Sequence, residues 1–129
     1  MGQRILISCD MCGCKKEMSV GAGLLSRRPD IIASCLDSKD AETWRQLYDG
    51  KKIDSFRSQQ KVYYCKNCKD LVCQLTVNAR LTDGTEKILG NLCEKCHNEL
   101  QEIDMEAHHM ICPICGNGDL SWKQVGFWD

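Results

Sequence analysis

The chain has 129 residues, a formal net charge of −1 and eleven cysteines, while aromatic residues make up only 6% of it. Its length suits one domain or two very small ones, whose thin conventional core needs support from a metal or a cross-link. No run of about 18 apolar residues occurs, which excludes a membrane-spanning helix, and the N-terminus lacks the apolar stretch of a secretory signal. We therefore expect a cytoplasmic protein, in which dense cysteines indicate metal or redox chemistry rather than disulfides.

The first 24 residues predict a strand, a turn and a second strand. The segments "RILIS" (4–8) and "KKEMSV" (15–20) have the composition of strands. They flank "CDMC" (9–12), which is expected to form a tight turn. This arrangement places two cysteines at the tip of a β-hairpin.

Two short helices are predicted to follow within residues 25–50. Pro29 suits the first turn of a helix, and "DIIASCL" (30–36) repeats apolar residues at helical spacing. The segment "DAETWRQLY" (40–48) has the same spacing, and Gly50 stands where a helix would stop.

A β pattern resumes from residue 60. "KVYY" (61–64) and "LVCQLTVNARL" (71–81) read as strands, and "TDGT" (82–85) is a turn that returns the chain into "KILGNL" (87–92). The C-terminal segment "LSWKQVGFW" (120–128) is also a plausible strand.

Four CxxC units are the strongest motif in the chain. A gap of two residues lets a tight turn direct two thiolates at one point about 2.3 Å from a metal ion. Two such turns supply a tetrahedral set of four sulfurs, which favours Zn²⁺ or iron. The sequence therefore predicts two Cys₄ sites and two Zn²⁺ ions per chain. The units are Cys9/Cys12, Cys65/Cys68, Cys93/Cys96 and Cys112/Cys115.

The pairing of these units has three solutions, of which we favour the nested one. The 24 residues between the second and third units read as strand, Asp-Gly turn and strand, a hairpin whose base a metal ion would close. Glycines at 13 and 116 follow only the first and last units, where they would relieve a strained turn. Sequential pairing remains an alternative, because 15 residues separate the third unit from the fourth, and crossed pairing is the third solution. The nested sites are Cys9, Cys12, Cys112 and Cys115 (site 1) and Cys65, Cys68, Cys93 and Cys96 (site 2).

The other cysteines and the histidines have less definite roles. Two cysteines are expected to be small buried hydrophobes on a helix and a strand, namely Cys35 and Cys73. The third, Cys14, is expected to turn away from site 1, which lies beside it. A ligand role is left open for this residue and for the histidines near the sites: Cys14, His97, His108 and His109.

Six short stretches carry a resemblance to a known group of proteins. They are "CDMCG" leading to "GAGLL", "TWRQLYDG", "YYCKNC", "CPICG" and the terminal "GFWD". Together they resemble small, uncharacterised bacterial zinc-ribbon (rubredoxin-like) proteins. The resemblance implies zinc and a ribbon fold, and it carries no assigned activity.

The expected fold is a small metal-stabilised α+β structure with two zinc-ribbon β units and a short two-helix insertion. Residues 1–24 and 107–129 would form a discontinuous terminal ribbon, and residues 60–104 a central ribbon. The helices of residues 25–50 would be inserted between them.

The expected function is a non-enzymatic zinc-binding module that interacts with an unknown protein partner. Four cysteines around each Zn²⁺ leave no open coordination position for catalysis. No phosphate-binding loop, catalytic triad or carboxylate pair is evident, so no small-molecule substrate and no membrane contact are expected. Four large aromatic residues are candidate contacts, although packing in the core is the more common role of such residues: Trp44, Trp122, Phe127 and Trp128.

Two other functions remain as alternatives. Six Lys and Arg residues between 51 and 70, together with Tyr63 and Tyr64, suggest a nucleic-acid-binding surface. Eight thiolates and two Zn²⁺ would bring the formal charge to about −5, which opposes this alternative. The second alternative is a redox-sensitive zinc thiol switch, with Cys14 or Cys73 as a resolving thiol.

Overall fold

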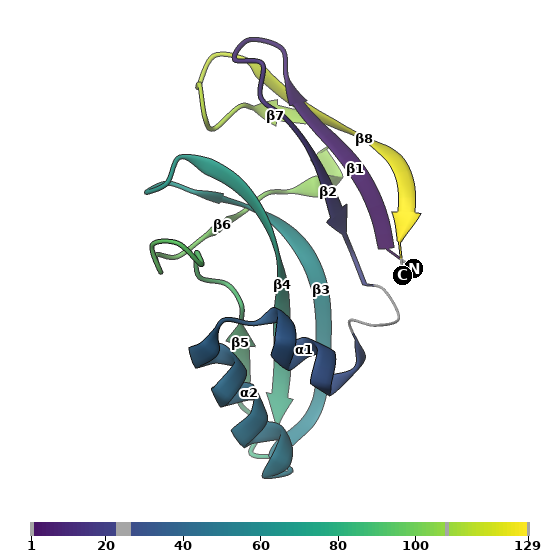
Figure 1. Ribbon diagram of the computed structural model, residues 1–129, viewed down its shortest axis with the longest axis vertical. Coiled ribbons are helices and arrows are strands. Elements are labelled where there is room, and N and C mark those ends of the chain that lie inside the picture. Colours follow the sequence, from purple (N-terminus) through teal and green to yellow (C-terminus); the bar gives the residue numbers. More distant parts are fainter. Residues whose placement is uncertain (1, 23–26, 108, 129) are drawn as a thin grey trace.

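A computed structural model describes residues 2–22, 27–107 and 109–128. This part of the chain forms two four-stranded antiparallel sheets and two short helices (Figure 1). The terminal sheet has the strand order β2-β1-β8-β7, and the central sheet has the order β5-β4-β3-β6. The elements are β1 (Gly2–Cys9), β2 (Lys15–Val20), α1 (Pro29–Cys35), α2 (Ser38–Asp49), β3 (Ile53–Cys65), β4 (Asp70–Leu81), β5 (Glu86–Leu89), β6 (Gln101–Glu102), a 3₁₀ turn (Met105–Ala107), β7 (His109–Ile111) and β8 (Asp119–Trp128).

The terminal sheet joins the two ends of the chain. β1 pairs with β2 on one edge and along its whole length with β8 on the other. Gly2 lies opposite Trp128, and the start of β1 and the end of β8 lie next to each other in Figure 1. A side chain at Gly2 would overlap the indole ring of Trp128, whose Nε1–H donates to the carbonyl of Val20 at 2.9 Å. Glycine at this position therefore allows the indole to close over the backbone of β1.

The central sheet is built on one long hairpin. β3 and β4 remain paired from Ile53 opposite Leu81 to Cys65 opposite Asp70. The first half of β3 was not recognised in the sequence, because "IDSFRSQQ" has few apolar residues and no clear alternation. The hairpin is therefore longer than a unit that only closes a metal site.

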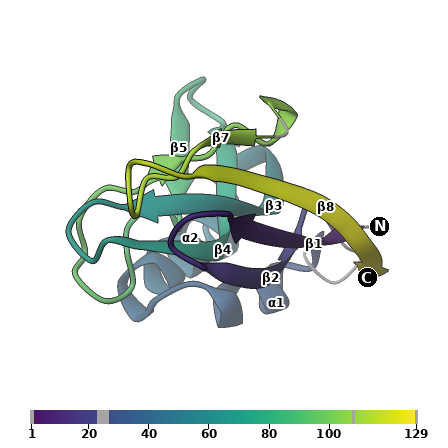
Figure 2. The same ribbon diagram turned by 90° about the horizontal axis from the view of Figure 1, so that it is seen from above.

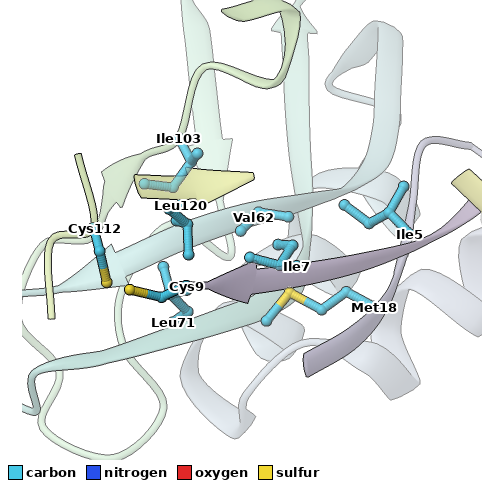
Figure 3. Packing of buried hydrophobic residues seen from close by; sticks show 9 residues of the cluster. All are labelled: Ile5, Ile7, Cys9, Met18, Val62, Leu71, Ile103, Cys112 and Leu120. Atoms are coloured by element: carbon cyan, nitrogen blue, oxygen red, sulfur yellow. The ribbon is translucent and has the colours of Figure 1, made fainter. Parts of the chain in front are cut away.

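The hairpin has one face that serves two hydrophobic clusters. Alternate residues of β4 share this face, so Leu71 points into the first cluster while Leu75, Val77 and Ala79 point into the second. Figure 2 shows α1 and α2 along one side of the β3–β4 pair. The first cluster lies between the two sheets (Figure 3) and consists of Ile5, Ile7, Cys9, Met18, Val62, Leu71, Ile103, Cys112 and Leu120. The second lies beneath the helices and consists of Ile32, Ala33, Leu36, Ala41, Trp44, Leu75, Val77, Ala79 and Leu89.

Polar contacts also join the two sheets. Gly21, just after β2, forms a two-way backbone bridge with Gln60 of β3, with N···O distances of 2.9 and 2.7 Å. Lys16 of β2 forms an ion pair with Asp70 of β4, and its Nζ donates to the Leu71 carbonyl at 2.9 Å. The hydrogen bond from the Lys16 ammonium lowers the pKa of Asp70 below its usual value.

The helices form where the sequence predicts them. Pro29 occupies the first turn of α1, and Asp37 caps α2 by accepting a hydrogen bond from the Asp40 N–H at 2.8 Å. Trp44 of α2 is only 1% exposed, and its Nε1–H donates to the Pro29 carbonyl at 3.1 Å. Neither helix has the length and apolar character needed to cross a lipid bilayer, among the residues that the structure describes.

The predicted fold class is wrong. The described chain is mostly antiparallel β-sheet in two four-stranded sheets, and it is not an α+β arrangement of two zinc-ribbon units with a helical insertion. The reason is the length of β3 and β4, which run past the cysteines and pack against both the terminal sheet and the helices. The predicted domain ranges (1–24 with 107–129, 25–50, and 60–104) stay a prediction.

Replacement of Trp44 should destabilise the fold strongly. Trp44→Ala leaves a large cavity under the helices and should lower the free energy of unfolding by about 3–5 kcal/mol. Trp44→Phe mainly removes the hydrogen bond to Pro29 and should cost about 1–2 kcal/mol. Chemical denaturation of the metal-saturated protein measures both. Ile88→Ala is the control, since Ile88 is 49% exposed; an equal loss in Ile88→Ala and Trp44→Ala would contradict this account of the second cluster.

Candidate metal centres

Each CxxC unit lies in a turn at the end of strands. Residues 9–12 connect β1 to β2, residues 65–68 connect β3 to β4, and residues 112–115 connect β7 to β8. Residues 93–96 lie in a loop after β5, closed by a bridge between Leu92 and Glu99. The strands thus place each pair of thiols at a sheet end.

The structure brings the eight cysteines together in two groups of four. Within each group all Sγ atoms lie within 4.8 Å of one another. The groups are those of the nested arrangement, so neither sequential nor crossed pairing occurs in this structure. Centre 1 consists of Cys9, Cys12, Cys112 and Cys115, and centre 2 of Cys65, Cys68, Cys93 and Cys96.

The sulfur spacing fits a tetrahedral metal ion. In centre 1 the Sγ–Sγ distances are 3.6 Å for Cys9–Cys115 and 4.0 Å for Cys12–Cys112. The corresponding distances in centre 2 are 3.5 Å and 3.9 Å. A tetrahedron with metal–sulfur bonds of about 2.3 Å has edges of roughly 3.8 Å. Either group can therefore hold a metal ion without rearrangement of its sulfurs.

The two centres follow one construction plan. In each, the first strand of one CxxC hairpin lies beside the strand that follows the other CxxC unit, namely β1 beside β8 and β3 beside β6. Backbone N–H groups point at equivalent sulfurs, with Cys12 N 3.5 Å from Cys9 Sγ and Cys68 N 3.4 Å from Cys65 Sγ. Such N–H groups stabilise thiolate charge, so the surrounding backbone suits metal-bound sulfur.

Burial is also similar in the two centres. The first cysteine of every CxxC unit is buried, and the second is partly or fully exposed. Cys9 and Cys112 belong to the first hydrophobic cluster, and Figure 3 shows their sulfurs turned toward each other at its end. Centre 1 is thus continuous with the core between the sheets.

The residue after each second cysteine has a left-handed backbone conformation. These residues are Gly13 (φ 73°), Lys69 (φ 54°), His97 (φ 61°) and Gly116 (φ 73°). Glycine adopts this conformation without strain, whereas lysine and histidine do not. The sequence interpretation recognised this requirement at Gly13 and Gly116, and the same turn occurs at the two non-glycine positions of centre 2.

Hydrogen bonds set the charge of the thiols in the absence of metal. The backbone N–H of Asn98 is the main cause that lowers the pKa of Cys96 to about 6, and that of Asn117 does the same for Cys115, also to about 6. The pKa of Cys68 is raised to about 12, chiefly because its thiol is hydrogen-bonded to Cys96. Each group therefore contains one thiol that ionises readily and begins to form the thiolate set that a metal requires.

The three remaining cysteines lie outside both groups of ligands. Cys14 is half-buried against the first cluster. Cys35 is exposed, so the prediction that it is buried is wrong; the buried side of α1 is formed by Ile32 and Ala33. Cys73 is half-buried, its Sγ lies 3.0 Å from the Ser19 carbonyl, and burial raises its pKa to about 11.

The histidines do not join either group among the described residues. His97 is exposed and carries the strained turn of centre 2. His109 is exposed on β7, with Nδ1 3.5 Å from an oxygen of Asp119. His108, for which a ligand role was left open, lies outside the described residues.

The aromatic residues near the centres are mostly occupied in packing. Tyr63 is only 4% exposed, and its hydroxyl is 2.5 Å from Thr76 Oγ1, while Tyr64 packs against the first cluster. Trp122 is half-buried and donates to the Met105 carbonyl at 3.1 Å. Phe127, in contrast, is 62% exposed.

Gly118 is a residue of centre 1 that the sequence interpretation missed. Its N–H lies 3.3 Å from Cys115 Sγ, and a Cβ atom on it would stand 2.5 Å from Cys9 Sγ and 2.8 Å from Met11 Cβ. The local signal was a second glycine in "CGNG" (115–118), which places backbone without a side chain against the thiols.

No protein-family model, curated protein or solved structure matches this chain. The resemblance to bacterial zinc-ribbon proteins therefore stays a prediction from short motifs. The assignment of a metal site depends on the two groups of cysteines themselves.

Substitutions after the CxxC units should have opposite effects in the two centres. Gly116→Ala meets no atom within 4 Å, so only its backbone conformation is penalised, and it should lower the free energy of unfolding by about 1 kcal/mol. His97→Gly relieves the same strain and should raise it, by up to about 1 kcal/mol. Denaturation of the metal-saturated variants measures both effects. Loss of stability in both variants would show that the positive φ at these positions does not determine how the substitutions affect stability.

A side chain at residue 118 should weaken centre 1 selectively. Gly118→Ala places a methyl group against Cys9 Sγ and should reduce the metal affinity of this centre about tenfold. Glu99→Ala is the matched control, because Glu99 is exposed and lies equally far after Cys96 in centre 2. In a chelator competition, Gly118→Ala should release one of its two metal equivalents at a lower chelator concentration than the unmodified chain does. Glu99→Ala should release both as the unmodified chain does. Unchanged release would contradict the close approach of residue 118 to the sulfurs.

Proposed function

We propose that the chain is a non-enzymatic zinc protein whose two Zn²⁺ ions are structural and whose surface contacts other macromolecules. One observation carries the metal part of this proposal: eight cysteines form two groups whose sulfur spacing matches a tetrahedral ion. Four thiolates in a tetrahedron favour Zn²⁺ or iron, and zinc suits a closed site with a structural role.

The position of the cysteines supports a structural role for the metal. Centre 1 fastens the β1–β2 hairpin to the β7–β8 hairpin, so it links segments about 100 residues apart in sequence. Centre 2 fastens the tip of β3–β4 to the loop after β5. Two such metal cross-links would give a small core stability that burial of apolar residues alone does not provide.

A catalytic role for these ions is disfavoured by their ligand sets. A catalytic zinc ion has three protein ligands and one open position, whereas each group here offers four thiols. A bound zinc ion would be held by four thiolates, and the fourth cysteine of each group would occupy the position that a catalytic zinc site leaves open.

A protein partner is best accommodated at the end of β8. Phe127 is 62% exposed and Val125 is 48% exposed, and both lie in the half of β8 beyond its short pairing with β7. Exposed aromatic side chains are typical anchors of protein interfaces. Trp44, in contrast, is buried under the helices and is unsuitable for such contact.

A nucleic-acid surface built on Tyr63 and Tyr64, and a redox switch with Cys73 as resolving thiol, have weaker support. Tyr63 and Tyr64 are engaged in packing, so they offer no platform on which bases of a nucleic acid could stack. The raised pKa of Cys73 leaves little thiolate for a resolving role in a redox switch.

Metal analysis of the purified protein tests the proposal. Elemental analysis should find about two Zn per chain, and Cys12→Ser or Cys68→Ser should each reduce this to about one. Removal of zinc with a chelator should unfold the sheets, as followed by circular dichroism, because metal binding and folding are coupled. Cys35→Ser is the control and should retain both ions, since Cys35 is exposed on α1. One zinc or none in the unmodified chain, or a fully folded zinc-free chain, would refute the proposal.

A further inference from the structure

The outer face of the central sheet carries a cluster of polar residues that the metal centres do not involve. Val77 and Ala79 of β4 point into the second cluster, so Asn78 and Arg80 between them point the opposite way. The register places Arg57 of β3 opposite Asn78, and Ser55 opposite Arg80. The two arginines are therefore diagonal neighbours on one exposed face.

These residues line a hollow in the surface. Its volume is about 410 Å³. Arg57 and Arg80 are both exposed, and neither forms an ion pair among the described residues, in contrast to Arg4, which pairs with Glu17. The hollow is lined by Ser55, Phe56, Arg57, Asn78, Arg80 and Glu86.

A second hollow continues this surface along β3. It has a volume of about 470 Å³, shares Phe56 and Arg57 with the first, and adds Arg27 and Gln59. Guanidinium groups from three segments thus border two adjoining hollows. Among the described residues that line the two hollows, Glu86 is the one carboxylate, and it lies opposite Arg80 in the β4–β5 ladder without an ion pair to it.

We propose that this outer face binds the phosphate groups of a nucleic-acid backbone. Arginine presents a planar fork of donors that matches phosphate oxygens, and Ser, Asn and Gln side chains commonly complete such contacts. The surface has this combination in Arg57, Arg80, Ser55, Asn78 and Gln59.

The composition of the face favours phosphate over a protein partner. A protein interface needs an apolar anchor at its centre. Phe56 is the one aromatic residue among the described lining residues, and it packs edge-on against Trp44 with ring centroids 5.1 Å apart. The same contact removes Phe56 as a stacking platform for bases. The expected binding is therefore independent of base sequence and depends on charge.

The overall charge limits the strength of this contact. Two Zn–thiolate centres would make the protein acidic as a whole, which would confine the attraction to the arginine-lined face. Two phosphate contacts on a single strand predict a slope of about −1.4 in the logarithm of affinity against the logarithm of salt concentration. The inference is independent of the proposed zinc chemistry, because none of its residues belongs to either centre.

The test is fluorescence anisotropy of a labelled oligo-dT strand with the metal-saturated full-length chain across a salt series. Arg57→Ala and Arg80→Ala should each weaken binding about threefold or more at low salt and reduce the slope to about −0.7. Arg57→Lys keeps the charge but not the donor fork and should fall between Arg57→Ala and the unmodified chain. Glu86→Gln removes the opposing carboxylate and should strengthen binding.

Arg45→Ala is the matched control, since Arg45 is an exposed arginine on α2 that lines neither hollow. Zinc content and circular dichroism confirm that each variant is folded, which separates this test from the test of the zinc proposal. Three outcomes would overturn the inference: no binding at low salt, an equal loss in Arg45→Ala, or tighter binding of an oligo-glutamate peptide than of oligo-dT.

Discussion

The close approach of four sulfur atoms is the interaction on which the rest of this structure depends. Thiolates repel one another, and neutral thiols are weak hydrogen-bonding groups, so four sulfurs within 4.8 Å of one another form a group that could hold a metal ion. In centre 1 this contact fixes Cys9 to Cys115 and so sets the two ends of the chain side by side. The long ladder between β1 and β8 then follows, together with the apolar residues that it covers. Without this fastening, a hydrophobic cluster of nine residues would have to gather segments from both ends of the chain unaided.

The β3–β4 hairpin connects centre 2 with both hydrophobic clusters. Its tip belongs to centre 2, its middle packs against the terminal sheet, and its far end supports the helices. Lys16 and Asp70 strengthen the middle of this arrangement by joining β2 to β4 through an ion pair whose carboxylate has a lowered pKa. The stability that this ion pair contributes is fully present at pH values above the ordinary carboxyl pKa. It is lost as the pH falls through the lowered pKa of Asp70. The helices are therefore part of one continuous packing arrangement along β4 and are not a separate layer inserted into it.

The sequence predicts local elements and the ligand groups better than it predicts their assembly. CxxC spacing and the strand–turn–strand reading between Cys68 and Cys93 favoured the nested groups over sequential and crossed pairing, because metal geometry restricts where thiols can lie. The class of fold was predicted wrongly, since it depends on where β3 begins. Residues 53–60 are mainly polar because one face of this hairpin is open to solvent and the opposite face is only partly covered. Exposure of Cys35 was missed for a related reason: a short helix buries too narrow a stripe for spacing alone to decide its edge.

The two centres share a plan but meet its steric demands differently. Centre 1 has glycine after both second cysteines, and Gly118 gives its sulfurs further room, so its turns form with little backbone strain. Centre 2 has Lys69 and His97 in the same left-handed conformation, which costs on the order of 1–2 kcal/mol per residue. That strain is tolerable in centre 2 because a thirteen-residue strand and the helix-supported cluster hold its hairpin. Centre 1 closes the two ends of the chain across a much longer loop, so relaxed glycine turns are needed there most.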